Sequence, residues 1–201
     1  MANQTRYKKL ILSLYSIGAV KFGTFTLKSG EVSPIYIDLR ILVSHPKVML
    51  EVAKAYLPIL KNLKYKRMAG VPYAALPIVA TISMLNRKPW IYNRKEVKDY
   101  GTKKQIEGEY KEGETVVVID DLVTTGLSKL EVIKIFKEAK LKVRDIAVLI
   151  YREQGGMSAL KKKGYKLYYA FSVNVMADVL FKEGKISKKR YQEVIDYFKN
   201  G

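Results

Sequence analysis

The stretch TVVVIDDLVTTGLSK, residues 115–129, decides the fold class of this chain. It contains a continuous apolar, β-branched run from Val116 to Ile119, of the kind found in strands that are covered on both faces of a parallel sheet. Two adjacent carboxylates, Asp120 and Asp121, stand at the end of this run. The stretch therefore predicts a buried parallel strand that ends in two acidic side chains.

A hydroxyl-rich turn and a helix follow the carboxylates. The turn is Thr124-Thr125-Gly126, and the apolar residues after it recur at helical spacing, namely Leu127, Leu130, Ile133 and Phe136. Charged residues stand between them and predict a solvated helix face: Lys129, Glu131, Lys134 and Lys137. Ligands of open α/β sheets bind at the carboxyl ends of strands, where a helix N-terminus attracts phosphate. The threonine hydroxyls suit contact with an anion, and the carboxylates suit hydroxyl groups or a hydrated cation.

The segment VVVIDDLVTTG, residues 116–126, resembles the signature with which phosphoribosyltransferases bind phosphoribosyl pyrophosphate (PRPP). That signature is an apolar strand, two acidic residues, two variable positions and a Thr/Ser-Thr/Ser/Ala-Gly turn. Neither a Walker loop nor a dinucleotide-binding glycine motif occurs in the chain. A plain strand-to-helix loop with two solvated aspartates is the alternative interpretation. The resemblance implies that the PRPP site includes Asp120, Asp121, Leu122, Val123, Thr124, Thr125, Gly126, Leu127 and Ser128.

Composition limits the class of protein. A chain of 201 residues is long enough for one well-packed domain and short for two. Its 48% hydrophobic and 28% charged residues are typical of a globular fold. The absence of cysteine excludes disulfides, thiolate metal sites and a cysteine nucleophile. No apolar run approaches the length of a membrane span, and the N-terminal segment is typical of a helix rather than a signal peptide, so we expect a cytoplasmic protein.

The charge balance is strongly basic, with 37 Lys and Arg against 19 acidic residues and a formal net charge of +18. A basic domain can bind nucleic acid or a small polyanion, and a lysine-rich composition also occurs in heat-adapted proteins. The positive residues are spread over predicted helices and loops, and no nucleic-acid motif accompanies them. We therefore favour solvated faces and an anionic substrate over nucleic acid.

The N-terminal segment predicts a helix over residues 5–19 and two short strands, 25–27 and 35–39, joined by a hairpin or a looped connection. Taken alone, the strands are a surface ribbon with an exposed lysine. The segment also resembles that of the orotate phosphoribosyltransferases, in which Phe-x-Leu-Lys-Ser-Gly-x-x-Ser-Pro and the aromatic residue after it line the pyrimidine pocket. The resemblance implies that Lys28 and Tyr36 contact orotate, the lysine as a point charge and the ring as a flat wall.

The next elements alternate between helix and strand. We expect a helix over 46–62, a strand over 67–71, a helix over 74–85 and a strand over 90–92. Ser44 or His45 is the expected cap of the first of these helices. His45 is the only histidine, and its place at a helix start assigns it no catalytic role. Ala74 stands where many members of the resembling family carry a lysine, so one pyrophosphate contact of those members cannot be made here.

Residues 94–113 form a long polar stretch with several glycines and no clear periodicity. A loop of this length in a compact domain is usually functional or mobile, and a solvated charge run is the simpler interpretation. Beside the PRPP motif, the stretch resembles the flexible catalytic loop of the family. The resemblance implies PRPP contacts from Arg94, Lys95, Lys98 and Tyr100, the last of which stands where many members have histidine.

The C-terminal third predicts a strand over 143–150, a second strand over 166–171, and helices over about 173–181 and 187–198. Arg152 lies just past the carboxyl end of the first strand. A guanidinium at this place can pair with a carboxylate through two hydrogen bonds, although a surface arginine that caps the sheet is the alternative. Arg152 resembles the arginine with which the family recognises orotate.

The alternation of elements predicts a mostly parallel α/β sheet flanked by helices, in one domain over residues 1–201. The resemblance implies a hood, formed by about residues 1–40 and C-terminal elements, over a PRPP-binding core at about 65–172. It also implies transfer of the phosphoribosyl group of PRPP to orotate, with Mg²⁺ bound mainly through PRPP and water and without a direct protein ligand. The implied catalytic residues are Lys98, Lys28 and Asp121, and the implied orotate contacts are Lys28, Tyr36, Thr124 and Arg152.

The resemblance further implies a homodimer in which the catalytic loop reaches the neighbouring site, with no nucleic-acid or membrane partner. Two other functions stay open from the sequence. A phosphoribosyltransferase for another base is disfavoured by Lys28 and Arg152, because a neutral purine offers no carboxylate. A PRPP-sensing regulator that binds nucleic acid is disfavoured because the segment before Phe22 is short for a helix-turn-helix unit.

Overall fold

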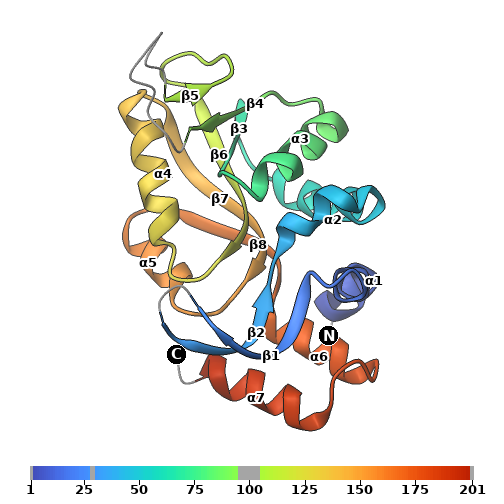
Figure 1. Ribbon diagram of the computed structural model, residues 1–201. Coiled ribbons are helices and arrows are strands. Elements are labelled where there is room, and N and C mark those ends of the chain that lie inside the picture. Colours follow the sequence, from blue (N-terminus) through green and yellow to red (C-terminus); the bar gives the residue numbers. More distant parts are fainter. Residues whose placement is uncertain (1, 28–29, 95–104, 200–201) are drawn as a thin grey trace.

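The computed structural model describes residues 2–27, 30–94 and 105–199, and a β-sheet lies at its centre (Figure 1). Within these residues the sheet has six strands in the order β5-β4-β3-β6-β7-β8. Their bounds are β3 (Arg67–Gly70), β4 (Trp90–Asn93), β5 (Ile106–Glu107), β6 (Thr115–Val123), β7 (Lys142–Tyr151) and β8 (Lys166–Ser172). Neighbouring strands are parallel except β4 and β5, which pair antiparallel. The predicted, mostly parallel α/β sheet is confirmed.

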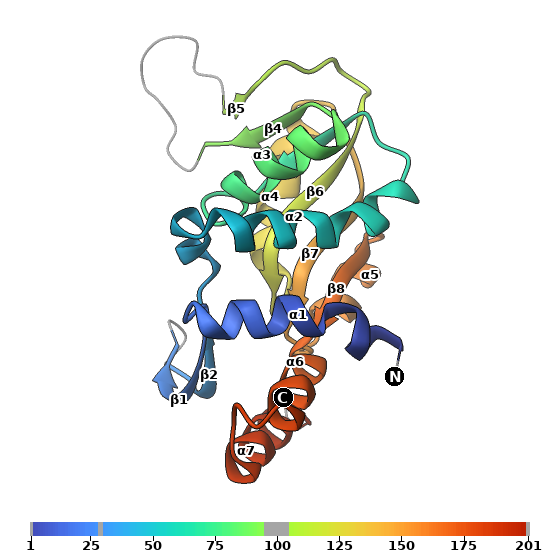
Figure 2. The same ribbon diagram turned by 90° about the vertical axis from the view of Figure 1, so that its right-hand side faces the viewer.

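Helices cover both faces of the sheet, as Figure 2 shows. The helices are α2 (Pro46–Lys61) and α3 (Ala75–Asn86) on one face, and α4 (Leu127–Glu138) and α5 (Gly156–Lys162) on the other. Side chains of β6 alternate between the two cores, so that Val117 and Ile119 pack with α2 and α3 while Val116 and Val118 pack with α4. Burial on both faces is the reason that the central strand is continuously apolar.

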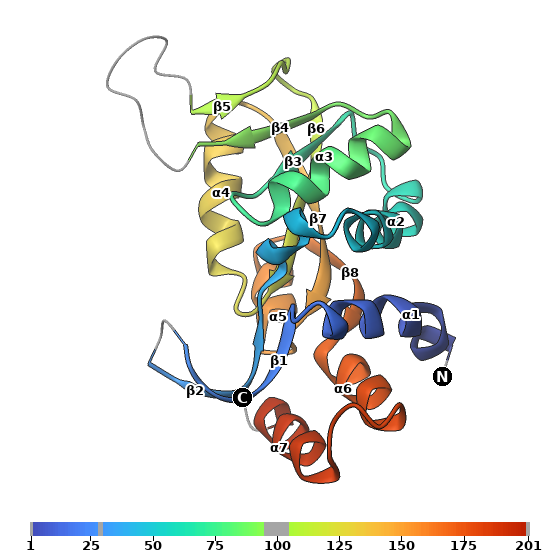
Figure 3. The same cartoon turned by 45° about the vertical axis from the view of Figure 1, so that its right-hand side comes forward.

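A smaller layer, the hood, lies beyond the carboxyl ends of the parallel strands (Figures 1 and 3). It consists of α1 (Ala2–Ser16), β1 (Val20–Thr26), β2 (Val32–Ile37), α6 (Val173–Lys182) and α7 (Lys188–Lys199). The two strands form an antiparallel hairpin in which Lys21 lies opposite Tyr36 and Phe25 opposite Ser33. A short 3-10 helix, η1 (Leu39–Ser44), which the sequence did not predict, connects the hairpin to α2.

Two local predictions need correction, and one helix was not predicted. β6 does not end at its carboxylates, because Asp120 pairs with Val148 of β7 and the ladder continues to Val123. The polar stretch before β6 is not loop throughout, because β5 pairs along β4. α5 was not predicted, since it is short and begins with a glycine, a poor helix former. The other predicted helices and strands are present to within a few residues, except that β1 begins at Val20 and not at residue 25.

His45 precedes α2 as predicted, but its side chain makes no capping hydrogen bond. Within the described part of the chain, every helix is too short or too polar to cross a membrane.

Candidate active site

The carboxylates of Asp120 and Asp121 are held within β6 by a network of short hydrogen bonds. The amide of Asp121 donates to Oδ1 of Asp120 at 2.9 Å, and the amide of Leu122 donates to Oδ1 of Asp121 at 2.7 Å. From α2, the buried hydroxyl of Tyr56 donates to the backbone carbonyl of Asp120 at 2.7 Å. The strand and the helix together therefore give both carboxylates a defined position.

Lys129 makes an ion pair with Asp120. Its ammonium Nζ contacts Oδ2 of Asp120, and both side chains are more than nine-tenths buried. The same Nζ donates to Oγ of Ser128 at 3.2 Å. The sequence placed Lys129 on a solvated helix face, and this prediction is wrong, because the first turn of α4 lies against the end of β6 and turns the side chain toward the carboxylates.

The proximity of two buried acids perturbs their titration. Burial, followed by the charge of the adjacent Asp120, raises the pKa of Asp121 to about 8, and Lys129 opposes this rise. Burial also raises the pKa of the Tyr56 hydroxyl well above its usual value, with Asp121 and Asp120 adding to the effect. The raised pKa favours the protonated form of Asp121 near neutral pH, and a protonated carboxyl can both donate a hydrogen bond to a ligand hydroxyl and accept one.

The turn after β6 leads directly into the N-terminus of α4. Gly126 caps the helix with φ of 83°, a left-handed conformation that suits glycine. A Cβ on Gly156 would lie 2.2 Å from the carbonyl oxygen of Thr124, so the start of α5 packs directly on this turn. The first amides of a helix lack intrahelical acceptors, and the positive end of the helix dipole favours an anion there. The geometry suits a phosphate group next to the two carboxylates.

A cavity of about 620 Å³ is lined by both carboxylates and by the first turn of α4, but not by residues 122–127. The cavity is lined by the β3–α3 turn, the end of β4, the carboxylates of β6, the beginning of α4 and Arg40 of η1. The lining residues of these strands and helices include Val71–Ala74, Asn93, Arg94, Asp120, Asp121, Ser128 and Lys129. Asn93 is buried, and its Oδ1 has no hydrogen-bond partner within the described residues. Ala74 lies in the wall of the cavity.

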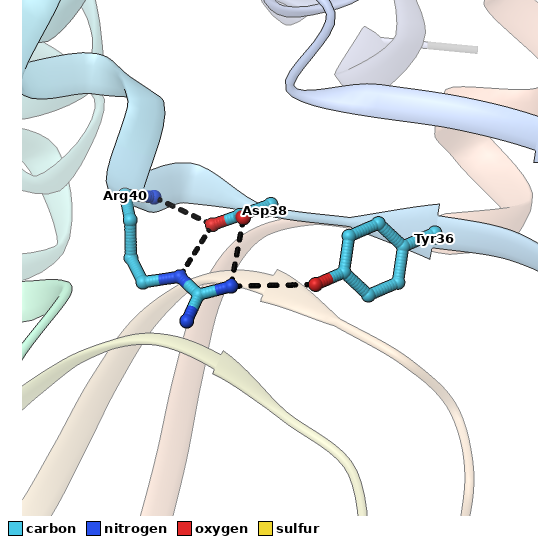
Figure 4. Close-up of polar contacts among 3 residues, drawn as sticks. All are labelled: Tyr36, Asp38 and Arg40. Atoms are coloured by element: carbon cyan, nitrogen blue, oxygen red, sulfur yellow. Dashed lines mark hydrogen bonds and ion pairs between the residues drawn. The ribbon is translucent and has the colours of Figure 1, made fainter. Parts of the chain in front are cut away.

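Arg40 connects this cavity with the hood (Figure 4). Its Nε donates to Oδ1 of Asp38 and its Nη2 to Oδ2, both at 2.7 Å, and Nη2 also donates to the Tyr36 hydroxyl at 3.3 Å. The hydrogen bonds from Arg40 lower the pKa of Asp38. Sequence reasoning named Tyr36 but missed Arg40, although an Asp-x-Arg segment directly after a strand was a signal that could have indicated it.

Arg152 lies where β7 meets the hood. Its Nη2 donates to Oγ of Ser33 at 3.4 Å, and its guanidinium carbon lies 5.6 Å from the centre of the Phe198 ring. Burial lowers the pKa of Arg152, and its Nε has no hydrogen-bond partner among the described residues. A buried guanidinium with an unused N–H favours an incoming anionic group such as a carboxylate.

Arg94 continues the wall beyond β4. Its guanidinium forms an ion pair with Glu107 of β5, and its amide donates to the carbonyl oxygen of Gln105 at 2.8 Å. The structure therefore places Arg94 in the same cavity as Asp120 and Asp121, but with a partner that the sequence did not predict. Four predicted site residues lie outside the described residues, namely Lys28, Lys95, Lys98 and Tyr100.

Comparisons with known proteins agree with this geometry. The sequence model of the phosphoribosyl transferase domain family matches residues 44–175. The orotate phosphoribosyltransferase of Pyrobaculum aerophilum is 36% identical over 189 residues, which cover 94% of this chain and 97% of the relative. The bifunctional enzyme PyrF/PyrE of Nostoc sp. is 41% identical over 182 residues, which cover 90% of this chain and 38% of the relative. The structure of Leishmania donovani UMP synthase is similar with a TM-score of 0.91 and 41% identity, covering 97% of this chain and 42% of that one.

The fold, the cavity and the matched domain define the class of protein as a phosphoribosyl transferase. This chain spans about two fifths of the length of the Nostoc and Leishmania relatives, whereas it covers the Pyrobaculum relative almost completely. The chain belongs to the orotate phosphoribosyltransferase family.

Proposed function

We propose that this protein transfers the phosphoribosyl group of PRPP to orotate, giving orotidine 5′-monophosphate and pyrophosphate in the synthesis of UMP. The observation that carries the proposal is the cavity in which the buried carboxylate pair of β6 adjoins the N-terminus of α4. In the reaction, the bond from the ribose C1 to pyrophosphate breaks, a bond from C1 to a ring nitrogen of orotate forms, and that nitrogen loses its proton.

In the proposed complex, the turn after β6 binds the 5′-phosphate of PRPP. Amides and hydroxyls of the segment from Thr124 to Ser128 face this phosphate, with Leu122 and Val123 shaping the approach. Asp120 and Asp121 accept hydrogen bonds from the ribose hydroxyls. Because the pKa of Asp121 is raised to about 8 by burial, the protein carries less negative charge beside the polyanionic substrate than two ionised carboxylates would.

Orotate binds beneath the hood in this proposal. Arg152 pairs with the orotate carboxylate through its unused Nε–H, and Tyr36 covers one face of the ring. Thr124 and Lys28 complete the proposed orotate contacts, with Lys28 also acting near the leaving group. A base without a carboxylate would leave the buried Arg152 unpaired, which disfavours purines as substrates.

The leaving pyrophosphate requires positive charge. Arg94 lines the cavity, and we propose that Lys95, Lys98 and Tyr100 complete its contacts when the loop after β4 closes and excludes water. Among the described residues, no group of three or more acidic or histidine side chains could hold a metal ion. The two carboxylates and open cavity suit Mg²⁺ carried mainly by PRPP oxygens and water, where it supplies charge neutralisation for the departing diphosphate.

A homodimer and a cytoplasmic location are parts of the proposal. Exposed apolar side chains lie on η1, α2 and α3, and Met84 is the most exposed of them at 84%. The others on these elements are Val43, Leu50 and Leu85. A second copy of the chain would cover such side chains, and light scattering that finds an active monomer would contradict the dimer.

Consumption of orotate, followed by its ultraviolet absorbance, tests the function. We expect loss of orotate with PRPP and Mg²⁺ present and none when either is omitted. Pyrophosphate release with another base and none with orotate would overturn the roles of Lys28 and Arg152. Lys98→Ala should lower turnover far more than stability, and a variant with normal turnover would remove this residue from the reaction.

A further inference from the structure

The site contains a buried lysine, Lys129, to which the proposed function assigns no role. The Lys129 side chain is only 8% exposed, and its ammonium reaches the Asp120 carboxylate, which is 6% exposed. Burial of an ammonium is costly unless a charged partner and hydrogen bonds compensate it. A lysine of the same helix, Lys134, stays in solvent at 79% exposure, so α4 does not bury its lysines in general.

The position of Lys129 distinguishes the two carboxylates. Its Nζ contacts Asp120 and Ser128, whereas Asp121 accepts from the amide of Leu122. Asp120 thus has a fixed counterion. Asp121 lines the same cavity without this direct contact to Lys129. Because PRPP is itself a polyanion, a cation at this place also removes one negative charge from the surface that the substrate meets.

We propose that Lys129 is a positioning residue of the reaction, which holds the Asp120 carboxylate in place as an ionised acceptor for a ribose hydroxyl of PRPP. The inference rests on the proposed function, since it assigns the ribose to this pair. Lys129 acts through Asp120 and its loss changes the binding of PRPP more than that of orotate, whose proposed contacts lie beneath the hood.

The test compares Lys129→Met with the wild type and with Lys134→Met, which removes an exposed lysine of the same helix. We expect Lys129→Met to raise the KM for PRPP by about tenfold or more, as for loss of a charge-assisted contact, with the KM for orotate within about twofold. Lys134→Met should leave both values unchanged. Calorimetric titration of PRPP alone gives the same comparison without turnover.

Two further variants separate positioning from folding. Lys129→Gln keeps hydrogen-bond donors for Asp120 and Ser128 without the charge. If Lys129→Met does not fold, the PRPP affinity of Lys129→Gln provides the test. Lys129→Arg keeps the charge and should recover part of the PRPP affinity. A folded Met or Gln variant with PRPP affinity within about twofold of the wild type would overturn the proposal.

The pH profile supplies a readout that a purely structural role would not move. Lys129 lowers the pKa of Asp121, so its removal raises that pKa, and the part of the pH profile of kcat/KM for PRPP that follows the titration of Asp121 should move to higher pH. The other titratable groups around the pair stay in place in these variants: Tyr56 of α2, Arg40 of η1, Tyr73 before α3, Arg94 after β4 and Glu131 of α4. A pH profile that does not move in the Lys129 variants would contradict the proposal.

The outcomes also distinguish this inference from the function on which it rests. A wild type that consumes no orotate but binds PRPP would contradict the proposed function, and the binding comparison would still test Lys129. An active wild type with unaffected Lys129 variants would contradict the inference alone.

Discussion

Two ion pairs at the cavity, Lys129–Asp120 and Arg40–Asp38, differ in their exposure to solvent. The side chains of the first pair are 8% and 6% exposed, whereas those of the second are 65% and 30% exposed. Water screens the outer pair, so its net contribution to folding is small even though its geometry is bidentate. The inner pair has lost its hydration, so each member depends on the other. The buried Lys129–Asp120 pair therefore fixes the geometry of the site, whereas the exposed Arg40–Asp38 pair stays accessible to a ligand.

The largest expected effect comes from breaking the inner pair on its acidic side. Asp120→Ala leaves the Lys129 ammonium buried without a counterion, and we expect a loss of about 3–5 kcal/mol in the free energy of unfolding. Urea unfolding followed by circular dichroism measures it. Asp38→Ala is the matched control at the outer pair, and equal losses in the two variants would contradict the comparison.

The pH dependence of stability also differs between the two regions, and Asp121, which adjoins the inner pair, dominates it there. The pKa of Asp121 is raised from 3.8 to about 8 in the folded protein, so the folded state binds the proton more tightly than the unfolded state. The corresponding stability is complete below about pH 4 and is lost as pH rises toward about 8. As pH rises from about 4 to about 8, we expect the free energy of unfolding to fall less in Asp121→Asn than in the wild type.

At the outer pair, the pH dependence of stability has the opposite sign. The pKa of Asp38 is lowered by its hydrogen bonds from Arg40, so its stabilisation is present above pH 3.8 and is lost as pH falls below it. Denaturation curves at several pH values, recorded for Asp38→Asn and Asp121→Asn, separate the two contributions. Identical pH profiles for both variants would refute the assignment.

A smaller loss is expected from the hydrogen bond that supports the inner pair from α2. Tyr56→Phe removes only the hydroxyl and leaves the backbone carbonyl of Asp120 buried without this donor, at a cost of about 1–3 kcal/mol. Thermal or urea unfolding measures the change. Tyr191→Phe, which removes a hydroxyl that donates to Asp178 near the surface, is the control and should change stability less.

The smallest effect on stability is expected at the outer pair. Arg40→Gln should lower the free energy of unfolding by at most about 1 kcal/mol, because solvent already screens the charge. Salt should reduce even this difference, since the screening length falls to about 3 Å at 1 M. A loss that exceeds that of Tyr56→Phe, or one that salt does not change, would show that the outer pair behaves as a buried one.

Much of the fold follows from local sequence patterns. The β-branched run before Asp120, the apolar periodicity from Leu127 to Phe136 and the position of Arg152 after β7 were all predicted correctly, because strand and helix periods are written in nearby residues. β5 was missed because two residues carry no period, and they form a strand only where the open edge of β4 offers a pairing partner. α5 was missed because its start is favoured by packing on Thr124 rather than by helix propensity.

The chemical groups of the site can be read directly from the amino-acid sequence: two adjacent carboxylates, a Thr-Thr-Gly turn and an arginine after a strand. The tertiary structure alone decided that Lys129 is buried against Asp120 and that Arg40 reaches the same cavity from η1. The physical reason is that periodicity assigns residues to a strand or to a helix face, whereas burial depends on how the start of α4 lies against the end of β6. Such long-range packing sets the dielectric surroundings of a charge, and these surroundings decide whether a lysine is solvated or paired.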